Sequence, residues 1–403
     1  MIKSLRLINW KSFADATLYI DPLTVIIGMN ASGKSNILDA LCFLQRIVAG
    51  VPVTTAIVGD ERISPLRGGL DFCTKNKRKS FTLIVTIEDE SQNEFLYTIK
   101  VSTKLHKVHI ISEELSSRNK RERHLKSSFD NFYDYFAIKF TGKENFVHLK
   151  ASDNISAISP AYKQVAPKEL EPILDYLSDT ISKIFILDPI PSHMRNYATL
   201  SETLNSDASN IAGVLASLSQ NKKNSVESTL TSYLQQLPEG DIKRVWTERV
   251  GKFASDAMLY CEENWDGKTP QLLDARGMSD GTLRFLAIVA ALLTCKEGSL
   301  LVIEEIDNGL HPSRADTLVD MLRTLGARRN IDVIVTTHNP ALLNALGPEM
   351  VPFISVTHRD PSGASAITLL EDIDALPKLM AGGPLGRIVS EGRLESALQH
   401  AGD

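Results

Sequence analysis

Residues 28–35 read GMNASGKS, and no other stretch constrains the fold of this chain as strongly. It follows the pattern G-x-x-x-x-G-K-[ST], in which the glycines let the backbone approach an anion and the loop amides point inward at phosphate oxygens. The apolar run 23–27 predicts a buried strand, and apolar residues recur at helical spacing after the loop. A strand, a glycine loop and a helix N-terminus in this order predict a phosphate-binding site.

Each residue type in this loop has its own predicted role. Lys34 reaches the β- and γ-phosphates, and the Ser35 hydroxyl is a ligand for Mg²⁺. We therefore predict that ATP and Mg²⁺ bind here. The nucleotide-binding residues predicted in this stretch are Gly28, Asn30, Ala31, Ser32, Gly33, Lys34, Ser35 and Asn36.

The composition is that of a globular protein with a sizeable core, since 43% of the 403 residues are hydrophobic and 23% are charged. The net charge of −5 gives no global bias toward nucleic acid. The four cysteines are scattered without C-x-x-C spacing, so neither zinc nor a disulfide framework is indicated. No secretory signal is visible, and the longest apolar run, 285–295, is too short to span a membrane. The prediction is a cytoplasmic protein with no membrane association.

An antiparallel β layer is predicted beside the loop, within the first 150 residues. Residues 81–88 and 95–101 alternate in polarity around a polar turn and predict a hairpin, and 106–115 and 136–149 could supply further strands.

Helical patterns dominate the middle of the chain. No heptad pattern is sustained, so no long coiled-coil arm is expected. The elements predicted there are a helix at 168–183, a strand at 184–188, two helices within 207–237 that are split near Gln220, and a hairpin at 244–263.

Two basic clusters lack periodic apolar neighbours and are predicted to be loops. A solvated loop is the first interpretation of both, and contact with nucleic acid is the alternative. The first cluster is Lys75, Lys77, Arg78 and Lys79, and the second is Arg118, Lys120, Arg121, Arg123 and Lys126.

Residues 299–305 (SLLVIEE) have what a nucleotide-hydrolysing site needs as its second strand, an apolar run followed by two carboxylates. Glu304 is predicted to orient the Mg²⁺, directly or through water. Glu305 is predicted to be the general base that positions and polarises the attacking water. Apolar runs that end in acidic residues are common, so this prediction depends on the motifs around the strand.

Two such motifs flank the strand. Ser279 and Gly281 precede the apolar block 283–293, and a helix that begins in this way offers another anion site, with an ordinary helix cap as the alternative. His338 follows the predicted buried strand 331–337. A histidine there can sense a γ-phosphate, although a lone histidine is more often a capping or surface residue.

The order of these motifs resembles the ABC-type ATPases, specifically their soluble SMC/RecF/OLD-like branch. Asn9–Phe13 resembles the branch's N-terminal turn that faces the nucleotide, Ser279–Thr282 its signature motif and His338 its switch histidine. Residues 307–312 (DNGLHP) resemble its D-loop followed by the LHP of OLD-like proteins. The pattern is most similar to compact bacterial ATPases of genome-defence and toxin-like operons.

The resemblance implies an α/β fold: a P-loop NTPase with an ABC-type head, made of a mixed sheet core, an antiparallel β layer and a short helical insertion. We divide the chain into an ATPase lobe at 1–150, a helical insertion with a connecting hairpin at 151–270, and a second ATPase lobe at 271–403.

The resemblance also implies that ATP is held between two heads. We therefore expect a homodimer or a larger even assembly when ATP is bound, with slow hydrolysis. One head would supply the loop 28–35 with Lys11, Ser12, Glu304, Glu305 and His338, and the other would supply Ser279 and Gly281.

Two positions depart from the family pattern. Asp280 stands where the transporter-like signature has glycine, and Glu304 stands where the metal-side carboxylate is usually aspartate. A negative charge at Asp280 is expected to slow the binding of a γ-phosphate from another copy.

The segment after His338 is too short for the metal-binding nuclease domain that OLD-type proteins append, which has about a hundred residues. The acidic residues Glu371, Asp372 and Asp374 are therefore interpreted as a loop or helix start. The tail from Gly382 reads as a loop and a short helix. Any nuclease or toxin activity is expected to belong to a separate effector protein.

Three functions remain open from the sequence. The first is a regulatory ATPase that controls an effector, plausibly in anti-phage defence. The second is a RecF/SMC-like ATPase that binds DNA in repair or chromosome maintenance. The third is a scaffold with a nearly inactive nucleotide site, against which the intact Glu305 and His338 argue.

Overall fold

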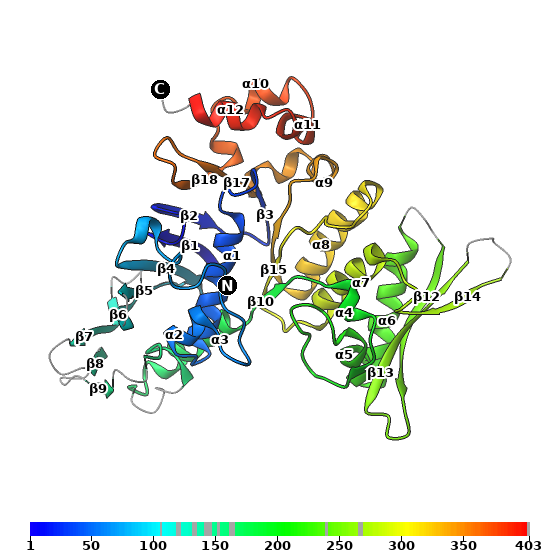
Figure 1. Ribbon diagram of the computed structural model, residues 1–403, viewed down its shortest axis with the longest axis horizontal. Coiled ribbons are helices and arrows are strands. Elements are labelled where there is room, and N and C mark those ends of the chain that lie inside the picture. The colour runs from blue at the N-terminus through cyan, green and yellow to red at the C-terminus, as the bar shows by residue number, and fades with distance from the viewer. Residues whose placement is uncertain are drawn as a thin grey trace.

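The structure is a computed structural model that describes residues 1–104, 107–117, 122–130, 135–140, 147–150, 154–160, 166–237, 241–264 and 269–400. Within these residues the strands form three sheets, of eight, six and four strands. Figure 1 shows the six-stranded sheet in the middle of the molecule, with the other two sheets on either side. The fold is therefore mixed α/β, as predicted.

The six-stranded sheet carries the predicted phosphate-binding loop at its centre. Its first five strands run parallel, and the last pairs antiparallel at the edge. In order across the sheet they are β10 (Ile184–Leu187), β15 (Leu300–Ile303), β16 (Asp332–Thr336), β3 (Leu23–Ile27), β17 (Ile354–Arg359) and β18 (Ser365–Leu369).

Both faces of this sheet are covered, which explains why its inner strands read as unbroken apolar runs. Successive side chains of a strand point to opposite faces. Val302 and Ile334 accordingly pack with α1 (Lys34–Val48) and α3 (Glu171–Ser182). Their neighbours Ile303 and Val335 pack with the helices of the other face, α7 (Asp280–Thr294) and α8 (Ala315–Arg329).

The eight-stranded sheet is antiparallel throughout, which confirms the predicted β layer. A cluster of three aromatic rings ties it to the rest of the molecule: Phe81 lies 4.7 Å from Trp10 and 5.4 Å from Phe43 of α1, between ring centres. In order, its strands are β2 (Asp15–Tyr19), β1 (Ile2–Ile8), β4 (Ser80–Glu88), β5 (Glu94–Lys104), β6 (Lys107–Ser117), β7 (Glu122–Asp130), β8 (Tyr135–Phe140) and β9 (Val147–Lys150).

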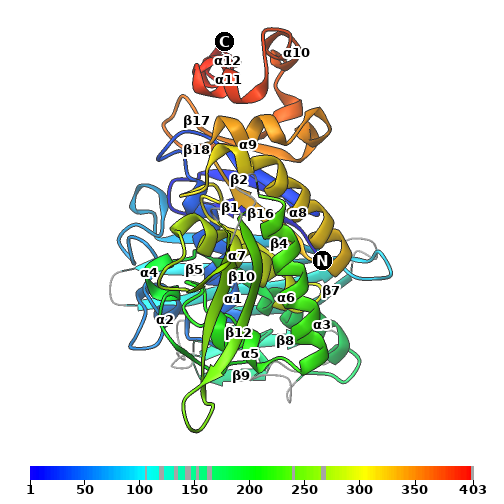
Figure 2. The ribbon, with the colours of Figure 1, turned by 90° about the vertical axis from the view of Figure 1, so that its right-hand side faces the viewer.

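The middle of the chain forms a separate layer of helices and strands. The predicted split of the helical region lies at Leu218 and Ser219, between α5 (Ile211–Ser217) and α6 (Gln220–Gln235). The predicted hairpin is β12 (Ile242–Val250) with β13 (Asp256–Glu263), and it projects at one end of the molecule (Figure 2). Two strands of this layer were not predicted, β11 (Ala198–Thr199) and β14 (Gln271–Asp274), and both pair with β13.

The C-terminal helices gather beside β17 and β18 at the end opposite the projecting hairpin (Figures 1 and 2). The acidic stretch 371–374 lies in a short 3-10 turn and the residues after it, as interpreted from the sequence. The remaining helices of the described chain are α2 (Val53–Val58), α4 (Pro191–Met194), α9 (Pro340–Ala345), α10 (Leu376–Met380), α11 (Leu385–Ser390) and α12 (Arg393–His400).

The structure agrees with the loop prediction for the first basic cluster and differs from it for part of the second. The first occupies a 3-10 turn at Lys75–Lys77 and the residues that lead into β4, in agreement with a loop. In the second, Arg123 and Lys126 lie on β7, so the loop prediction was wrong for them. Pairing with β6 supplies the strand geometry that the local sequence does not indicate. The other three residues of that cluster lie outside the described residues. No helix in the described ranges is long and apolar enough to cross a membrane.

Asp332, at the start of β16, provides a test of the packing of the central sheet. Its burial raises the pKa of the carboxyl to about 6, from an ordinary value of 3.8. Between these two values the folded state holds more protons than the unfolded state, so stability falls as the pH rises through 6. The variant Asp332→Asn should remove this dependence of stability on pH.

Between pH 5 and pH 8 the wild type should lose about 1 kcal/mol of unfolding free energy relative to the variant. Urea titrations of both proteins at pH 5 and pH 8 would measure this difference. An equal loss of unfolding free energy in the wild type and in Asp332→Asn would contradict the prediction.

Candidate functional site

The predicted phosphate-binding loop runs from the end of β3 to the start of α1, with its glycines in conformations that only glycine adopts readily. The φ angles are 143° at Gly28 and 122° at Gly33, and even Ala31 has a φ of 63°. A Cβ atom on Gly28 would lie 2.2 Å from the Thr357 carbonyl oxygen. The loop is therefore a strained and tightly enclosed turn at a helix N-terminus, as anion binding requires.

Lys34 lies across the mouth of this loop. Its ammonium donates hydrogen bonds to the carbonyl oxygens of Gly28, at 2.5 Å, and Met29, at 3.0 Å. Burial lowers the pKa of Lys34, although the carboxylates of Glu305 and Glu304 oppose that shift. The ammonium thus bonds to two loop carbonyls in the field of two carboxylates. A bound phosphate would bring an anion into direct contact with it.

The strand with two carboxylates ends beside the loop, as predicted. The Ser35 hydroxyl donates a hydrogen bond to Glu304, and Arg67 Nη1 donates to the same carboxylate at 2.9 Å. Burial raises the pKa of Glu304, but the hydrogen bonds from Arg67 and Ser35 outweigh it and hold the pKa below its ordinary value. A hydroxyl and an ionised carboxylate in contact are the hard oxygen ligands that Mg²⁺ prefers, so these two residues fit that ion.

Glu305 and His338 follow neighbouring parallel strands and therefore lie at the same edge of the sheet. Both side chains are exposed. Glu305 has a left-handed backbone (φ 46°), and its amide donates to the Thr336 hydroxyl at 2.8 Å. The Thr337 hydroxyl donates to Asp307 at 2.5 Å, which joins the segments that follow the two strands. Strain of this kind at a non-glycine residue is typical of functional sites.

Ser279 caps α7, and its hydroxyl accepts a hydrogen bond from the Thr282 amide at 3.1 Å. Gly281 lies against a different loop, because a Cβ there would be 2.7 Å from the Gly309 carbonyl oxygen. The contacts of these two residues are thus with their own helix and with the predicted D-loop. Asp280, which departs from the family pattern, is paired with Arg195 at 2.7 Å, so its negative charge is partly compensated.

The N-terminal turn, predicted to bind the nucleotide through Lys11 and Ser12, contacts α1. The Lys11 ammonium is buried in an ion pair with Asp39 of α1 and donates to the Arg67 carbonyl at 2.7 Å. Its charge is therefore directed at α1, and its contacts position the helix. The Ser12 hydroxyl accepts from Asn36 Nδ2 at 2.7 Å and so reaches the first turn of the same helix.

Arg67 is the functional residue that sequence reasoning missed. It bridges Asp39, at 3.2 Å, and Glu304, at 2.9 Å, although about half of its side chain is exposed. It lies in a segment, 59–72, that has no helix or strand. No periodic signal marks such a residue, because only the tertiary fold brings it to the carboxylate. Asn30 and Met29, at the tip of the loop, are exposed, whereas Ser32 is buried.

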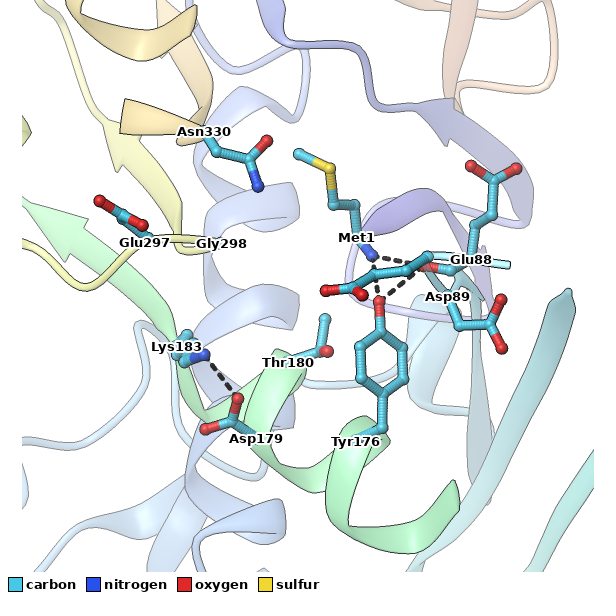
Figure 3. Close-up of a pocket in the computed structure, with 11 residues that line it drawn as sticks. Met1, Glu88, Asp89, Tyr176, Asp179, Thr180, Lys183, Glu297, Gly298 and Asn330 are labelled. Carbon is cyan, nitrogen blue, oxygen red and sulfur yellow. Dashed lines mark hydrogen bonds and ion pairs between the residues drawn. The ribbon is translucent and has the colours of Figure 1, made fainter. Parts of the chain in front are cut away.

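A pocket of about 310 Å³ lies away from the phosphate loop (Figure 3). Lys183, Gly298 and Asn330 line it and precede β10, β15 and β16, whereas the phosphate loop follows the carboxyl end of β3. The Met1 amine there donates to the Glu88 carbonyl at 2.6 Å and to the Tyr176 hydroxyl at 2.9 Å. Since the strands are parallel, this pocket lies at the opposite edge of the sheet.

Comparison with protein families identifies this arrangement. Residues 23–344 match the family described as "AAA domain, putative AbiEii toxin, Type IV TA system". Among curated proteins, an "ATP/GTP phosphatase" of Helicobacter pylori is 24% identical over 361 residues, which cover 86% of this chain and 87% of that protein. The "Chromosome partition protein Smc" of Rhodopirellula baltica is 54% identical over 43 residues, which are 10% of this chain and 4% of that protein.

A solved structure with a TM-score above 0.5 shows a similar fold. An SMC head bound to the C-terminal winged-helix domain of ScpA superimposes with a TM-score of 0.54 and 15% identity, over 91% of this chain and 97% of that chain. The SMC head domain from Thermotoga maritima gives a TM-score of 0.44 at 14% identity, over 91% of this chain and 98% of that chain. The likeness to the first of these agrees with the predicted P-loop head.

Proposed function

Because the chain belongs to the family described as "AAA domain, putative AbiEii toxin, Type IV TA system", and so to the P-loop ATPases, we propose that it hydrolyses ATP between two copies of itself and thereby controls a separate effector protein. The observation that carries this proposal is the meeting of Ser35, Glu304 and Arg67 beside the phosphate loop. It brings the phosphate loop and the strand with two carboxylates together within one chain.

The residues divide the chemistry as follows. The loop amides and Lys34 bind the phosphates, and Ser35 with Glu304 would hold Mg²⁺. When bound, that ion would neutralise charge on the phosphate oxygens. Glu305 accepts the proton of the attacking water and aligns it with the γ-phosphorus, while His338 donates a hydrogen bond to the γ-phosphate. The turn formed by Lys11 and Ser12 holds α1 in place beside the nucleotide.

The second copy completes the site in this proposal. The N-terminus of α7, with Ser279 and Gly281, presents backbone amides and a helix dipole to an anion. Within one chain these residues contact their own helix and Gly309, so the γ-phosphate would come from the partner's nucleotide. Arg195 offsets the charge of Asp280 and lessens the repulsion of that phosphate. ATP then acts as the link between the copies.

In this proposal, a separate effector protein carries out any nuclease or toxin reaction. Among them, no group of three or more histidine, cysteine, aspartate or glutamate side chains is arranged to hold a metal ion. A nuclease or toxin partner would supply the chemistry, and the ATPase would set its activity, plausibly in anti-phage defence. The toxin-system description of the family supports this setting.

The alternative is an ATPase that binds DNA in repair or chromosome maintenance. The local match to a chromosome partition protein favours it, as does the basic turn at Lys75–Lys77. Contacts with phosphates would make its binding fall steeply with salt.

ATP hydrolysis by the full chain, with and without duplex DNA, tests these functions against each other. The proposal predicts slow, Mg²⁺-dependent hydrolysis that DNA changes less than twofold, at either low or high salt. Strong stimulation by DNA that disappears at high salt would favour the DNA-binding alternative. No hydrolysis by the wild type beyond that of Glu305→Gln would overturn the enzymatic proposal.

A further inference from the structure

The carbonyl groups of the phosphate loop reveal a role for residues far away in the sequence. Because the amides of such a loop face inward, its carbonyls must point outward, and each needs a donor. Lys34 supplies the donor for Gly28 and Met29. The first turn of α1 supplies it for Gly33, through the Asn36 amide at 3.0 Å. The other donors come from outside the loop and its helix.

These donors lie on the hairpin formed by β17 and β18. The Ser365 hydroxyl donates to the Ser32 carbonyl, and Arg359 Nη2 donates to the Ala31 carbonyl at 2.7 Å. The Thr357 hydroxyl donates to the carbonyl of Ile27, the last residue of β3, at 3.0 Å. Ser365 and Thr357 are buried, whereas Arg359 is exposed, so the two hydroxyls are the better shielded from water.

The hairpin also fixes the shape of the loop by contact. The Thr357 hydroxyl lies 2.6 Å from that of Ser32. A Cβ on Gly33 would lie 2.8 Å from the Ser365 hydroxyl oxygen. Ser365 reaches the N-terminal turn as well, since its hydroxyl oxygen is within hydrogen-bond distance, 2.8 Å, of that of Ser12. One hairpin therefore holds the end of β3, the phosphate loop and the N-terminal turn together.

The hairpin contacts differ from those of Lys34 in what happens to them when a phosphate binds. When the Lys34 ammonium turns to a phosphate, the carbonyls of Gly28 and Met29 lose this donor, and Met29 keeps only the Ser32 amide at 3.2 Å. The bonds that Ser365 and Thr357 donate end on the backbone carbonyls of Ser32 and Ile27, which cannot donate to a phosphate. They can persist through nucleotide binding and keep the amides aimed inward, so that less ordering is required when the nucleotide arrives.

We propose that Thr357 and Ser365 are positioning residues for the nucleotide, with Arg359 in support: they hold the phosphate loop open and correctly turned before ATP binds. The inference rests on the proposed function, since it assumes that the loop binds ATP. It assigns a role to a hairpin that follows the switch histidine and that none of the predicted motifs includes.

The test compares ATP affinity in variants that lose these hydroxyls. Thr357→Val and Ser365→Ala should each weaken binding of a fluorescent ATP analogue about tenfold, since each removes hydrogen bonds made in a buried setting. At saturating ATP the turnover number should stay within about twofold of the wild type, so that KM rises and kcat does not. Ser365→Thr keeps a hydroxyl and should restore most of the affinity.

Matched controls lie on the same hairpin. Thr368→Val removes a hydroxyl whose hydrogen bond, at 3.0 Å, is to His358 and not to a loop carbonyl. Ser355→Ala removes a buried hydroxyl that makes no hydrogen bond within the described part of the chain. Both should leave ATP affinity unchanged, and the thermal midpoint without nucleotide should separate any loss of folding from a loss of binding.

Three results would be decisive against the proposal. Wild-type affinity in both Thr357→Val and Ser365→Ala would overturn the inference alone, as would equal losses in the matched controls. Failure of the wild type itself to bind ATP would overturn the proposed function, and the inference with it. If Ser365→Ala does not fold, Thr357→Val carries the test, because valine matches the shape of threonine.

Discussion

Replacing Lys34 with alanine is expected to abolish ATP hydrolysis and to weaken ATP binding by a hundredfold or more. The ammonium contacts two carbonyls of the phosphate loop, and hydrogen bonds to charged groups contribute about 1.5–3 kcal/mol each. The protein should still fold, because the variant removes a buried charge whose pKa is already lowered by burial. Equilibrium binding and a phosphate-release assay would measure both effects.

Lys183→Ala is a suitable control for this variant. Lys183 pairs with Asp179 at 2.5 Å and lines the pocket at the opposite edge of the sheet (Figure 3). Its loss should change neither binding nor hydrolysis. Lys34→Ala with affinity within threefold of the wild type would show that the phosphates bind elsewhere.

Replacing Glu305 with glutamine should lower the rate of hydrolysis by about 10²–10⁴-fold, the usual contribution of a general base, and should leave ATP binding intact. Glutamine has nearly the same shape but cannot accept the proton from water. The side chain is exposed, and its backbone is held by Thr336, so the fold should not change. Single-turnover hydrolysis measures the chemical step without product release.

A matched control is Glu297→Gln, in the distant pocket, which should hydrolyse ATP at the wild-type rate. A Glu305→Gln rate within tenfold of the wild type would assign the base to another group. Glu304 would be an unlikely replacement on physical grounds, since Ser35 and Arg67 already occupy its carboxylate.

Local patterns were sufficient for much of the fold. The phosphate loop, with β3 before it and α1 after it, was predicted from eight residues and their apolar neighbours. The buried strands β15 and β16 read as apolar runs because both of their faces are covered. The hairpin of β4 and β5 was clear from two runs rich in β-branched and aromatic residues around a polar turn.

Long-range pairing explains what the sequence could not reveal. β17 and β18 extend the central sheet beside β3, yet no local signal states that a segment more than 300 residues later pairs with the loop strand. Arg67 meets Glu304 only through the fold of an irregular segment. The ion pair between Lys11 and Asp39, one turn into α1, was not predicted either, because nothing in the sequence marks Asp39 as an acidic group facing inward.

The signature residues Ser279 and Gly281 are a different case. Their positions at the start of α7 follow from local sequence, and the cap is present. Their predicted role needs a second copy of the chain, so it stays a prediction that solution measurements must test.

The central claim is that ATP joins two copies of this protein, and the native mass of Glu305→Gln with and without ATP and Mg²⁺ tests it most directly. The account predicts a mass that doubles, or rises to a larger even multiple, when ATP is added, and that falls again when Lys34→Ala is introduced into the same chain. A Glu305→Gln protein that stays monomeric with ATP demonstrably bound would contradict it, because Ser279 would then have no phosphate of a second copy to meet.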